Sequence, residues 1–521
     1  MNKKCYYITT PIYYPSANPH VGTAYTTVLS DVLSRYKKLL GYEVFLTTGT
    51  DEHALKILHN ATKANKNPKD FVDDYVLVFK KLWANLDINY DAFIRTTDKK
   101  HEDVVKKVYQ KLNDLNLIVL KKWTGWYCNS CEENYAMNNI IKNGEQFFCN
   151  QRHLLSEKSE DSLFFKLSSF TSWIEQYLFK INPNLIYPES RRTELFNNFI
   201  KDGLEDLSIS RISQDWGIEV LADKYKTSDN KTHVAYVWID ALFSYLSALN
   251  FLQEDDSNYQ KFWNNENVEV IHLMSKEITR FHAIFWPIFL HSLNLKLPNK
   301  IIAHGWIITP EGKMSKSLGN VIDPYEYINA YGSDALRFFF VKGLVLENDS
   351  IFSKERFIEI YNTYLANTFG NLASRTYAMI KKYFNSIIPD VIEFKYFKQE
   401  YLKLEKLIIN INDAININDM NKVIDLLYEI NQWVNSFIET QKPWELFAKK
   451  EDEKLKEVLH LLANILRITF YYLSPILVQS STKILTSFGL DLKAINQENI
   501  KNFNEINNKK LTDFAIIFKR I

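Results

Sequence analysis

The sequence contains little cysteine, no long apolar run and almost no net charge. Four cysteines occur among 521 residues, and three of them lie between positions 128 and 149. This usage argues against a disulfide-stabilised framework and is typical of a reducing compartment. No run of about 18 apolar residues occurs, so no membrane-spanning helix is predicted. The first residues show no signal-peptide pattern, and we therefore expect a cytoplasmic location.

The net charge and the length of the chain restrict the possible class of protein further. The formal net charge of +1 excludes a generally basic coat for nucleic acid, so any contact with RNA must come from local patches and none with DNA is expected. A chain of 521 residues with 46% apolar residues exceeds a single core and predicts about three domains. The motif G-x-G-x-x-G is missing, which excludes the dinucleotide-binding variant of a nucleotide fold.

The N-terminal part alternates between strand and helix patterns. Cys5–Thr10 is a short apolar run, a periodic helix follows His20, and Tyr42–Thr48 reads as a second strand. A strand, a helix and a strand of this length form a βαβ unit with parallel strands. Ligands bind beyond the carboxyl ends of such strands, where we expect Tyr14, His20 and Gly49–His53 to lie.

The patterns along the rest of the chain predict its domains. Short aromatic strands interrupt the α/β pattern near residue 120, and the pattern resumes near 231 with a strand at Thr232–Trp238. From about residue 355, apolar residues recur at helical spacing. We expect these units: an α/β domain in two halves, an insertion, a linker and a helical bundle, at residues 1–116 with 231–322, 117–230, 323–354 and 355–521.

Two segments have the composition of an anion site. The stretch Glu311–Asn320 places Lys313 and Lys316 three residues apart, with hydroxyls beside them and glycines on both sides. Mobile ammonium groups of this kind can bind a polyphosphate, although the same composition also occurs in solvated turns. His20 and Gly22 stand at the start of a helix, where backbone N–H groups attract anions.

The clustered cysteines predict a metal site. Cys128 and Cys131 form a C-x2-C pair, and Cys149 and His153 follow with three residues between them. Three thiolates and one imidazole suit one structural Zn²⁺ held in a zinc knuckle. The alternative is a chance grouping in a chain that is nearly devoid of cysteine.

The lysine stretch and the helix start together resemble a known family. Lys313–Ser317 matches the Lys-Met-Ser-Lys-Ser motif of class I aminoacyl-tRNA synthetases in full, and His20–Thr23 resembles their His-Ile-Gly-His motif. The resemblance covers essentially the whole chain. The similarity narrows to the methionine-specific branch through four stretches: Thr10–Tyr14, Val237–Tyr245, Ile278–Trp286, and Asn371–Arg375 with Lys442–Trp444.

The resemblance implies a fold and an activity. The fold would be α/β, a Rossmann-like parallel sheet split by a zinc-knuckle connective insertion and followed by an all-α anticodon-binding bundle, with the linker contacting the tRNA stem. The activity would join L-methionine to tRNA(Met), both initiator and elongator, at the expense of ATP with Mg²⁺. Because no appended tRNA-binding domain follows the bundle, the resemblance implies a monomer.

The resemblance also implies site residues. The catalytic residues would be His20, Lys313 and Lys316. Methionine would be bound by Pro11, Ile12, Tyr14, Asp51, Trp238, Ala241, Leu242, Tyr245, Ile278, His282 and Trp286. ATP would be bound by Tyr14, His20, Gly22, Thr23, Ser275, Glu277, His304, Ile307, Lys313, Lys316 and Ser317. The anticodon would be bound by Asn371, Arg375, Pro443 and Trp444.

The chemistry of methionine agrees with the implied pocket. Aromatic rings suit a polarisable thioether, Asp51 would pair with the ammonium group, and Tyr245 would donate its hydroxyl to the sulfur while His282 holds that hydroxyl. Each aromatic residue of the pocket taken singly is more often a core residue, whereas Trp444 taken singly fits a bundle core residue as well as an anticodon residue.

Three departures from the family pattern bear on this interpretation. Thr23 replaces a second histidine, Ser275-Lys-Glu277 replaces Gly-x-Asp, and His153 stands one residue further from Cys149 than in the usual Cys-x-x-His. Two other classes stay open, namely a synthetase-like RNA-binding or regulatory protein without catalysis, and a synthetase for another amino acid. Activity with weaker ATP affinity is the expectation.

Overall fold

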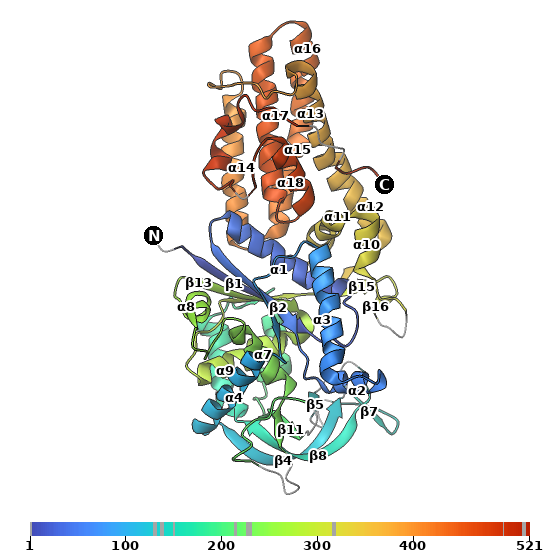
Figure 1. Ribbon diagram of the computed structural model, residues 1–521, viewed down its shortest axis with the longest axis vertical. Helices are drawn as coiled ribbons and strands as arrows, with labels where there is room; N and C mark the ends of the chain where they lie inside the picture. Colours follow the sequence, from blue (N-terminus) through green and yellow to red (C-terminus); the bar gives the residue numbers. More distant parts are fainter. Residues whose placement is uncertain are drawn as a thin grey trace.

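The protein is described here by a computed structural model. It describes residues 3–128, 133–135, 140–149, 152–212, 216–225, 232–314, 319–492, 494–512 and 517–521. Cys131, Lys316 and Ser317 lie outside this part of the chain, so their roles stay predictions. Figure 1 shows a helical bundle at one end, a parallel sheet in the middle and the antiparallel strands of the insertion at the other end.

The central sheet has six parallel strands in the order β3-β2-β1-β13-β14-β9. β1 pairs with β2 on one side and with β13 on the other, so the strand order reverses between β1 and β13. Such a reversal opens a crevice at the carboxyl ends of the strands. The strands are β1 (Cys5–Tyr13), β2 (Glu43–Thr50), β3 (Ala92–Arg95), β9 (Ile186–Tyr187), β13 (Val268–Ser275) and β14 (Lys300–His304).

The two faces of β1 explain its sequence. Tyr6 and Ile8 pack into the hydrophobic core that contains α1 (Val21–Leu39) and the bundle. Cys5 and Tyr7 pack into the core on the other face of the sheet. Because side chains alternate along a strand, an apolar run without alternation is buried on both faces. The helices with residues in that second core include α4 (Lys99–Asp114), α7 (Val237–Ser247) and α9 (Trp286–Ser292).

One local prediction was wrong in the α/β region, and two elements were not predicted there. His233–Ala235 forms β12, which pairs antiparallel with β11 (Ser210–Ile212) and does not rejoin the parallel sheet. The insertion supplies β9 to that sheet, and a helix, α2 (Leu55–Lys63), was not predicted. Short apolar runs carry too little period to reveal their pairing partners, which tertiary contacts decide.

The insertion is built on a long antiparallel pair. β4 (Ile118–Cys128) and β8 (Ser156–Phe165) pair along most of their length. β5 (Glu133–Tyr135) and β10 (Leu207–Ser208) complete a four-stranded sheet. A hairpin of β6 (Ile141–Asn143) and β7 (Gln146–Phe148) brings Cys149 back toward the end of β4.

The helical spacing predicted for the C-terminal region is confirmed. Its long helices are α13 (Asn371–Phe384), α14 (Lys398–Asn416), α15 (Met420–Gln441), α17 (Asp452–Leu473) and α18 (Val478–Ser487). α17 is buried along most of its length, at the centre of the bundle. Among the described residues, no helix combines the length and the apolar character that crossing a membrane requires.

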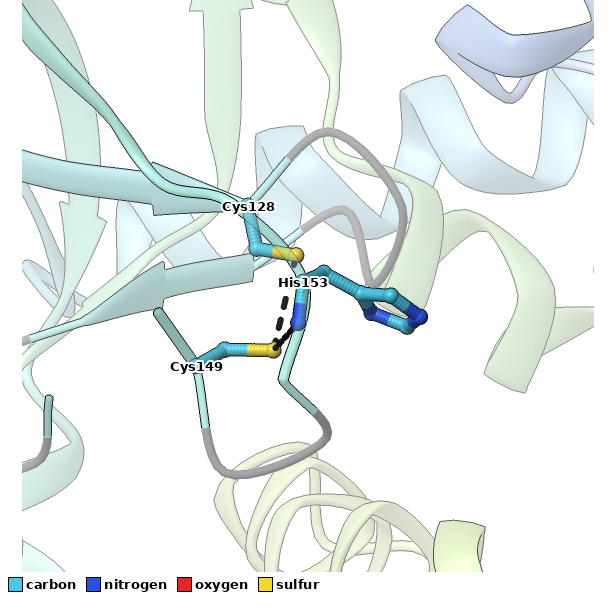
Figure 2. Close-up of side chains that lie close together, drawn as sticks. All are labelled: Cys128, Cys149 and His153. Atoms are coloured by element: carbon cyan, nitrogen blue, oxygen red, sulfur yellow. Dashed lines mark hydrogen bonds between the residues drawn. The ribbon is translucent and has the colours of Figure 1, made fainter. Parts of the chain in front are cut away.

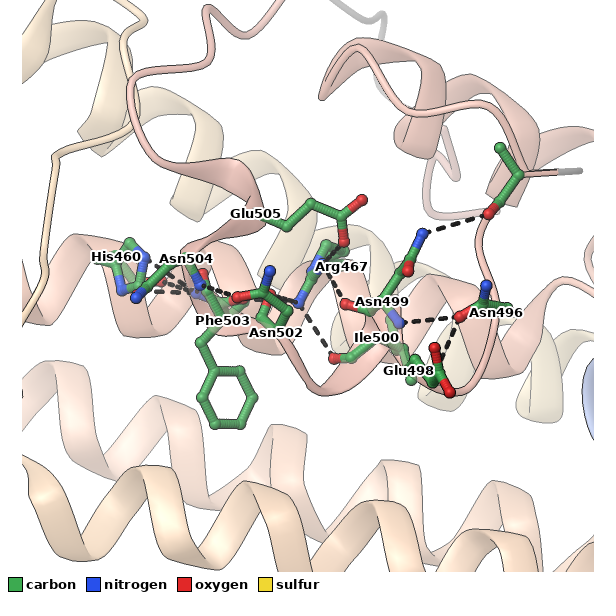
Figure 3. A network of polar contacts seen from close by, with 12 residues as sticks. His460, Arg467, Asn496, Glu498, Asn499, Ile500, Asn502, Phe503, Asn504 and Glu505 are labelled. Atoms are coloured by element: carbon green, nitrogen blue, oxygen red, sulfur yellow. Dashed lines mark hydrogen bonds and ion pairs between the residues drawn. The ribbon is translucent and has the colours of Figure 1, made fainter.

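The C-terminal segment packs back on α17 through a buried arginine (Figure 3). Arg467 donates to Glu505 at 2.8 Å and to the carbonyls of Ile500 and Asn502 at 3.1 and 3.0 Å. Gln497 of the same segment donates to the carbonyl of Leu39 at 3.2 Å. The segment therefore joins the bundle to the last turn of α1, whose first turn lies at the cavity described below.

A second buried arginine joins α1 to the bundle. Arg337 of α11 (Ser333–Phe338) is 0% exposed and donates to Asp31 of α1 at 2.6 Å. It also donates to the carbonyl of Leu86 at 2.8 Å and to those of Pro475 and Ile476 at 2.6 and 3.0 Å. Five planar donors on one group can connect three separate segments, which Lys could not do.

Candidate active site

A cavity of about 470 Å³ lies at the carboxyl ends of the central strands. Segments that are far apart in sequence line it, including the loop after β1, the start of α1, the end of β2, one side of α7 and the ends of β13 and β14. The lining includes every predicted methionine residue except Trp286. It also includes the predicted ATP residues within the described part of the chain: Tyr14, His20, Gly22, Thr23, Ser275, Glu277, His304, Ile307 and Lys313.

His20 is the N-cap of α1. Its Nδ1 accepts a hydrogen bond from the backbone N–H of Gly22 at 3.0 Å. A neutral imidazole that accepts at Nδ1 carries its proton on Nε2, which is therefore a donor. A Cβ added at Gly22 would lie 2.8 Å from His20 Cε1 and 3.9 Å from Met314 Cε. A side chain at Gly22 would displace the His20 ring, and Met314 of the lysine loop (311–320) lies next to the helix start.

Lys313, from the described part of the lysine loop, lines the same cavity as His20. Lys313 Nζ lies 3.9 Å from a carboxylate oxygen of Glu277, which follows β13. Both side chains are more than a third exposed, at 51% and 39%. His20 and Lys313, 293 positions apart in the sequence, therefore line one cavity, as the prediction of a shared nucleotide site requires.

His304 is held as a neutral ring at the end of β14. Burial lowers the pKa of His304 to about 4. Its Nδ1 lies 2.7 Å from the carbonyl of Gly305, which can only accept, so Nδ1 carries the proton. Its Nε2 then accepts from the hydroxyl of Thr26 at 2.7 Å. With both nitrogens bonded within the protein, His304 offers the cavity the surface of a ring.

Tyr245 and His282 form a buried pair in which the direction of the hydrogen bond differs from expectation. Burial lowers the pKa of His282 to about 4, so the ring is neutral near pH 7. Its Nδ1 lies 3.0 Å from the carbonyl of Ile278 and therefore carries the proton. Its Nε2 accepts from the Tyr245 hydroxyl at 2.7 Å. The hydroxyl proton thus points to His282, and the predicted donation to a thioether sulfur does not fit this geometry.

Trp286 lies behind the cavity wall instead of forming it. It is fully buried, and its Nε1 donates to Nε2 of His272 at 3.1 Å. His272 in turn lies 2.7 Å from the hydroxyl of Thr9, and its ring centroid is 4.7 Å from that of Tyr245. Trp286 is not among the residues that line this cavity, and its direct contact with methionine stays a prediction.

The loop after β2 is held by residues that sequence reasoning missed. Asp240, on α7, accepts from His53 at 2.8 Å and from His101 at 2.6 Å. Burial alone would raise the pKa of Asp240, but the two imidazoles outweigh it and hold the pKa below its ordinary value. Arg211 of the insertion donates to the carbonyl of His53 at 3.0 Å. These contacts fix the backbone beside Asp51, and nothing in the local sequence signals them.

Three of the predicted metal ligands lie together in the insertion (Figure 2). One ligand atom from each of Cys128, Cys149 and His153 lies within 4.8 Å of the others, and the two sulfurs are 3.8 Å apart. Two thiolates bound tetrahedrally to one Zn²⁺ at about 2.3 Å lie about 3.8 Å apart. The backbone N–H of His153 also donates to Cys149 Sγ at 3.3 Å. The donor set therefore fits zinc.

The predicted anticodon residues lie on the bundle. Arg375 on α13 donates to Glu439 at 3.0 Å and to Asn435 at 3.3 Å, both on α15. Trp444, on α16 (Pro443–Ala448), is 42% exposed. A core residue would be buried, so the exposure favours a surface role for Trp444. Figure 1 shows α16 at the end of the bundle far from the sheet.

Comparison with known families defines the class of protein. A family model described as "tRNA synthetases class I (M)" matches residues 6–377, which is more than half of the chain. This range contains the parallel sheet apart from the first residue of β1, together with the insertion and the lysine loop.

Individual relatives give the branch within that class. The methionine–tRNA ligase of Ureaplasma parvum is 44% identical over 100% of this chain and 99% of its own length. That of Mycoplasma genitalium is 41% identical over 100% of both. The structure of Mycobacterium tuberculosis methionyl-tRNA synthetase in complex with methionyl-adenylate has a TM-score of 0.92, at 31% identity over 99% of this chain and 100% of that chain. The chain belongs to the methionine–tRNA ligase family.

Proposed function

We propose that the protein activates L-methionine with ATP to methionyl-adenylate and transfers methionine to the 3′-terminal adenosine of tRNA(Met). The observation that carries this proposal is the single cavity shared by the His20 helix start, Lys313 and Asp51. A nucleotide and an amino acid can meet there at the strand ends. The complex of a relative with methionyl-adenylate supports it.

In the first step the methionine carboxylate attacks the α-phosphate of ATP, and pyrophosphate leaves. The protein contributes position and charge, as in other phosphoryl and nucleotidyl transfers. His20 donates from Nε2 to a phosphate oxygen, and the N–H groups at the start of α1 add to this site. Lys313 and Lys316 stabilise the developing negative charge on the phosphates. Mg²⁺ enters with ATP, held mainly by the phosphates.

Methionine is recognised at two ends. The buried carboxylate of Asp51 pairs with the ammonium group at the end of β2. The thioether lies among Ile12, Trp238 and Tyr245, where aromatic rings offer the polarisable contacts that sulfur favours. The neutral His304 and the backbone of Ile307 flank adenine, and Glu277 accepts from the ribose. In the second step the terminal ribose hydroxyl of tRNA attacks the adenylate carbonyl and releases AMP.

Exchange of labelled pyrophosphate into ATP tests the proposal. Exchange should depend on L-methionine and should be weak with other amino acids, cysteine and isoleucine included. Absence of exchange with every amino acid, together with retained tRNA binding, would favour a synthetase-like protein without catalysis. Faster exchange with another amino acid would identify a different substrate.

We expect one structural zinc per chain. Replacing Cys149 by serine should reduce the zinc content well below one equivalent and lower the unfolding temperature, since a metal-bound fold loses the free energy of metal binding. Zinc is measured by atomic absorption after dialysis. Cys5→Ser, a buried cysteine in the other core, is the matched control and should retain its zinc. A full equivalent of zinc in the Cys149→Ser variant would remove this assignment.

Trp444 should serve the RNA and not the chemistry of activation. Exposed aromatic rings stack on unpaired bases, each stack stabilising binding by about 1–3 kcal/mol. Trp444→Ala should therefore raise the KM for tRNA(Met) at least about five-fold and leave methionine-dependent exchange unchanged. Phe447→Ala is the control, because Phe447 lies on the same helix and is 48% exposed. Equal losses in charging and exchange would make Trp444 a packing residue.

Several finer statements belong to the same proposal. The division at residues 116, 230, 322 and 354, service of both initiator and elongator tRNA, a monomeric state and a cytoplasmic location follow from the family resemblance. Asn371 and Arg375 read base edges beside Trp444, and Pro443 starts the helix that carries this ring. Glu439 and Asn435 hold the Arg375 guanidinium for that role.

A further inference from the structure

Trp306 stands between β14 and β15 (Ile307–Thr309) with its backbone held on both sides. Its N–H donates to Asp349 Oδ1 at 2.8 Å, and its carbonyl accepts from the N–H of Ser350 at 2.9 Å. Gly305 permits this approach, because a Cβ there would lie 2.2 Å from the carbonyl oxygen of Asn348. The chain on both sides of Trp306 is therefore fixed at the edge of the cavity that the indole lines.

Two ammonium groups contact the indole ring. Lys276 Nζ lies 4.2 Å from the ring centroid, and Lys313 Nζ lies 4.1 Å from it. Lys276 is itself fixed, because its Nζ donates to both carboxylate oxygens of Asp349 at 2.7 and 2.9 Å. The same Asp349 thus holds the backbone of Trp306 and one cation on its ring. The indole therefore has anchors that do not involve Lys313.

Lys313 has a weaker anchor in Glu277. The pair is 3.9 Å apart and about half exposed, and such surface pairs contribute little by themselves. A cation over the face of a tryptophan ring is attracted more strongly, the more so where water is partly excluded. The ring, more than the carboxylate, therefore determines where the Lys313 ammonium stands.

We propose that Trp306, fixed by the Lys276–Asp349 pair, is a positioning residue for Lys313 and presents its ammonium to the phosphates at the mouth of the cavity. The inference rests on the proposed function, because ATP binding is what supplies a phosphate for Lys313 to contact. It assigns a role to Trp306, a cavity residue that the family resemblance did not name, although it named residues on both sides of it. It also gives Lys276 a role in the segment where Ser275 and Glu277 depart from the family pattern.

Steady-state pyrophosphate exchange on the full-length chain tests the inference. Trp306→Leu should lower kcat/KM for ATP about three- to five-fold, because the cation loses its aromatic face. Trp306→Phe, which keeps an aromatic ring, should lose about two-fold or less. The KM for methionine and the unfolding temperature should stay unchanged in both. Lys276→Met should fall between the two, since the ring remains but its orientation loosens.

A double-mutant cycle with Lys313→Met separates positioning from packing. In the Lys313→Met background, Trp306→Leu should change kcat/KM for ATP by less than about 1.5-fold, since the interaction is already gone. The same factor in both backgrounds would overturn the inference. If Trp306→Leu does not fold, Trp306→Phe and Lys276→Met replace it in the same cycle. The inference would be overturned equally if each of these variants changed kcat/KM for ATP by the same factor with and without Lys313→Met.

Two further results keep this inference distinct from the proposed function. If Lys313→Met alone left exchange unchanged, the charge assignment in the proposed mechanism would be wrong. If Lys313→Met lowered exchange while Trp306→Leu did not, only the positioning role would fall. Lys403→Met is the control, because it removes a Lys–Trp contact of 4.5 Å with Trp433 on the bundle and should leave all exchange parameters unchanged.

Discussion

Replacing His20 by alanine is expected to lower the rate of methionine-dependent exchange by about 10²–10³, the loss typical of removing one preorganised donor to a developing charge. The reason is the Nε2 proton, which the bond from Gly22 N–H to Nδ1 directs away from the helix. The KM for methionine should change little, because His20 lies on the nucleotide side of the cavity. Pre-steady-state formation of the adenylate measures the effect on the chemical step.

His20 also caps α1, so a control must separate capping from catalysis. His20→Asn keeps a side chain that caps well, whereas His20→Ala loses about 1 kcal/mol of helix stability. The asparagine variant should therefore unfold at the temperature of the unmodified protein and still be slow. Recovery of the rate in His20→Asn would show that capping, and not proton donation, is the contribution of this residue.

Replacing Arg337 by methionine is expected to destabilise the protein by about 3–5 kcal/mol, because Asp31 then stays buried with only part of its compensation. Both side chains are 0% exposed, and Arg35 at 2.7 Å is the remaining charged partner. Arg337→Lys should recover only part of the loss, since an ammonium group cannot reach the three segments together. Urea unfolding followed by circular dichroism gives the change in midpoint.

The same pair predicts how stability depends on pH. Burial would raise the pKa of Asp31, but Arg337 and Arg35 outweigh it and hold the pKa below its ordinary value. A carboxylate with a depressed pKa contributes its stability above the unfolded-state pKa and loses it as pH falls through the folded-state pKa. Acid should therefore destabilise the unmodified protein more steeply than Arg337→Met. Equal slopes of unfolding free energy against pH below pH 5 in the two proteins would contradict this prediction. A loss of unfolding free energy in Arg337→Met no larger than that in Lys66→Met, at an exposed ion pair, would contradict the predicted destabilisation.

The local pattern predicted the elements that have strong periodicity. The apolar run at β1, the helix after His20 and the helical spacing in α17 all follow from the burial of these elements. Strand pairing was less predictable. β12 looks like any short apolar strand, and only its partner β11 places it outside the parallel sheet. Trp286 likewise belongs to a stretch that resembles the family's pocket. Its burial depends on a contact with His272, which in turn contacts Thr9.

By itself the sequence determined the chemistry available: an imidazole at a helix start, paired lysines beside glycines, an acid after a strand and clustered thiols. These depend on residue type and short spacing, which the chain encodes locally. The tertiary structure alone decided the state of each group. The carbonyl of Ile278 sets the tautomer of His282 and so reverses the Tyr245 hydrogen bond, and Asp349 aligns Trp306 for Lys313. The direction of the Tyr245 hydroxyl and the orientation of the Trp306 ring follow from neighbours distant in sequence, so spacing along the chain cannot specify them.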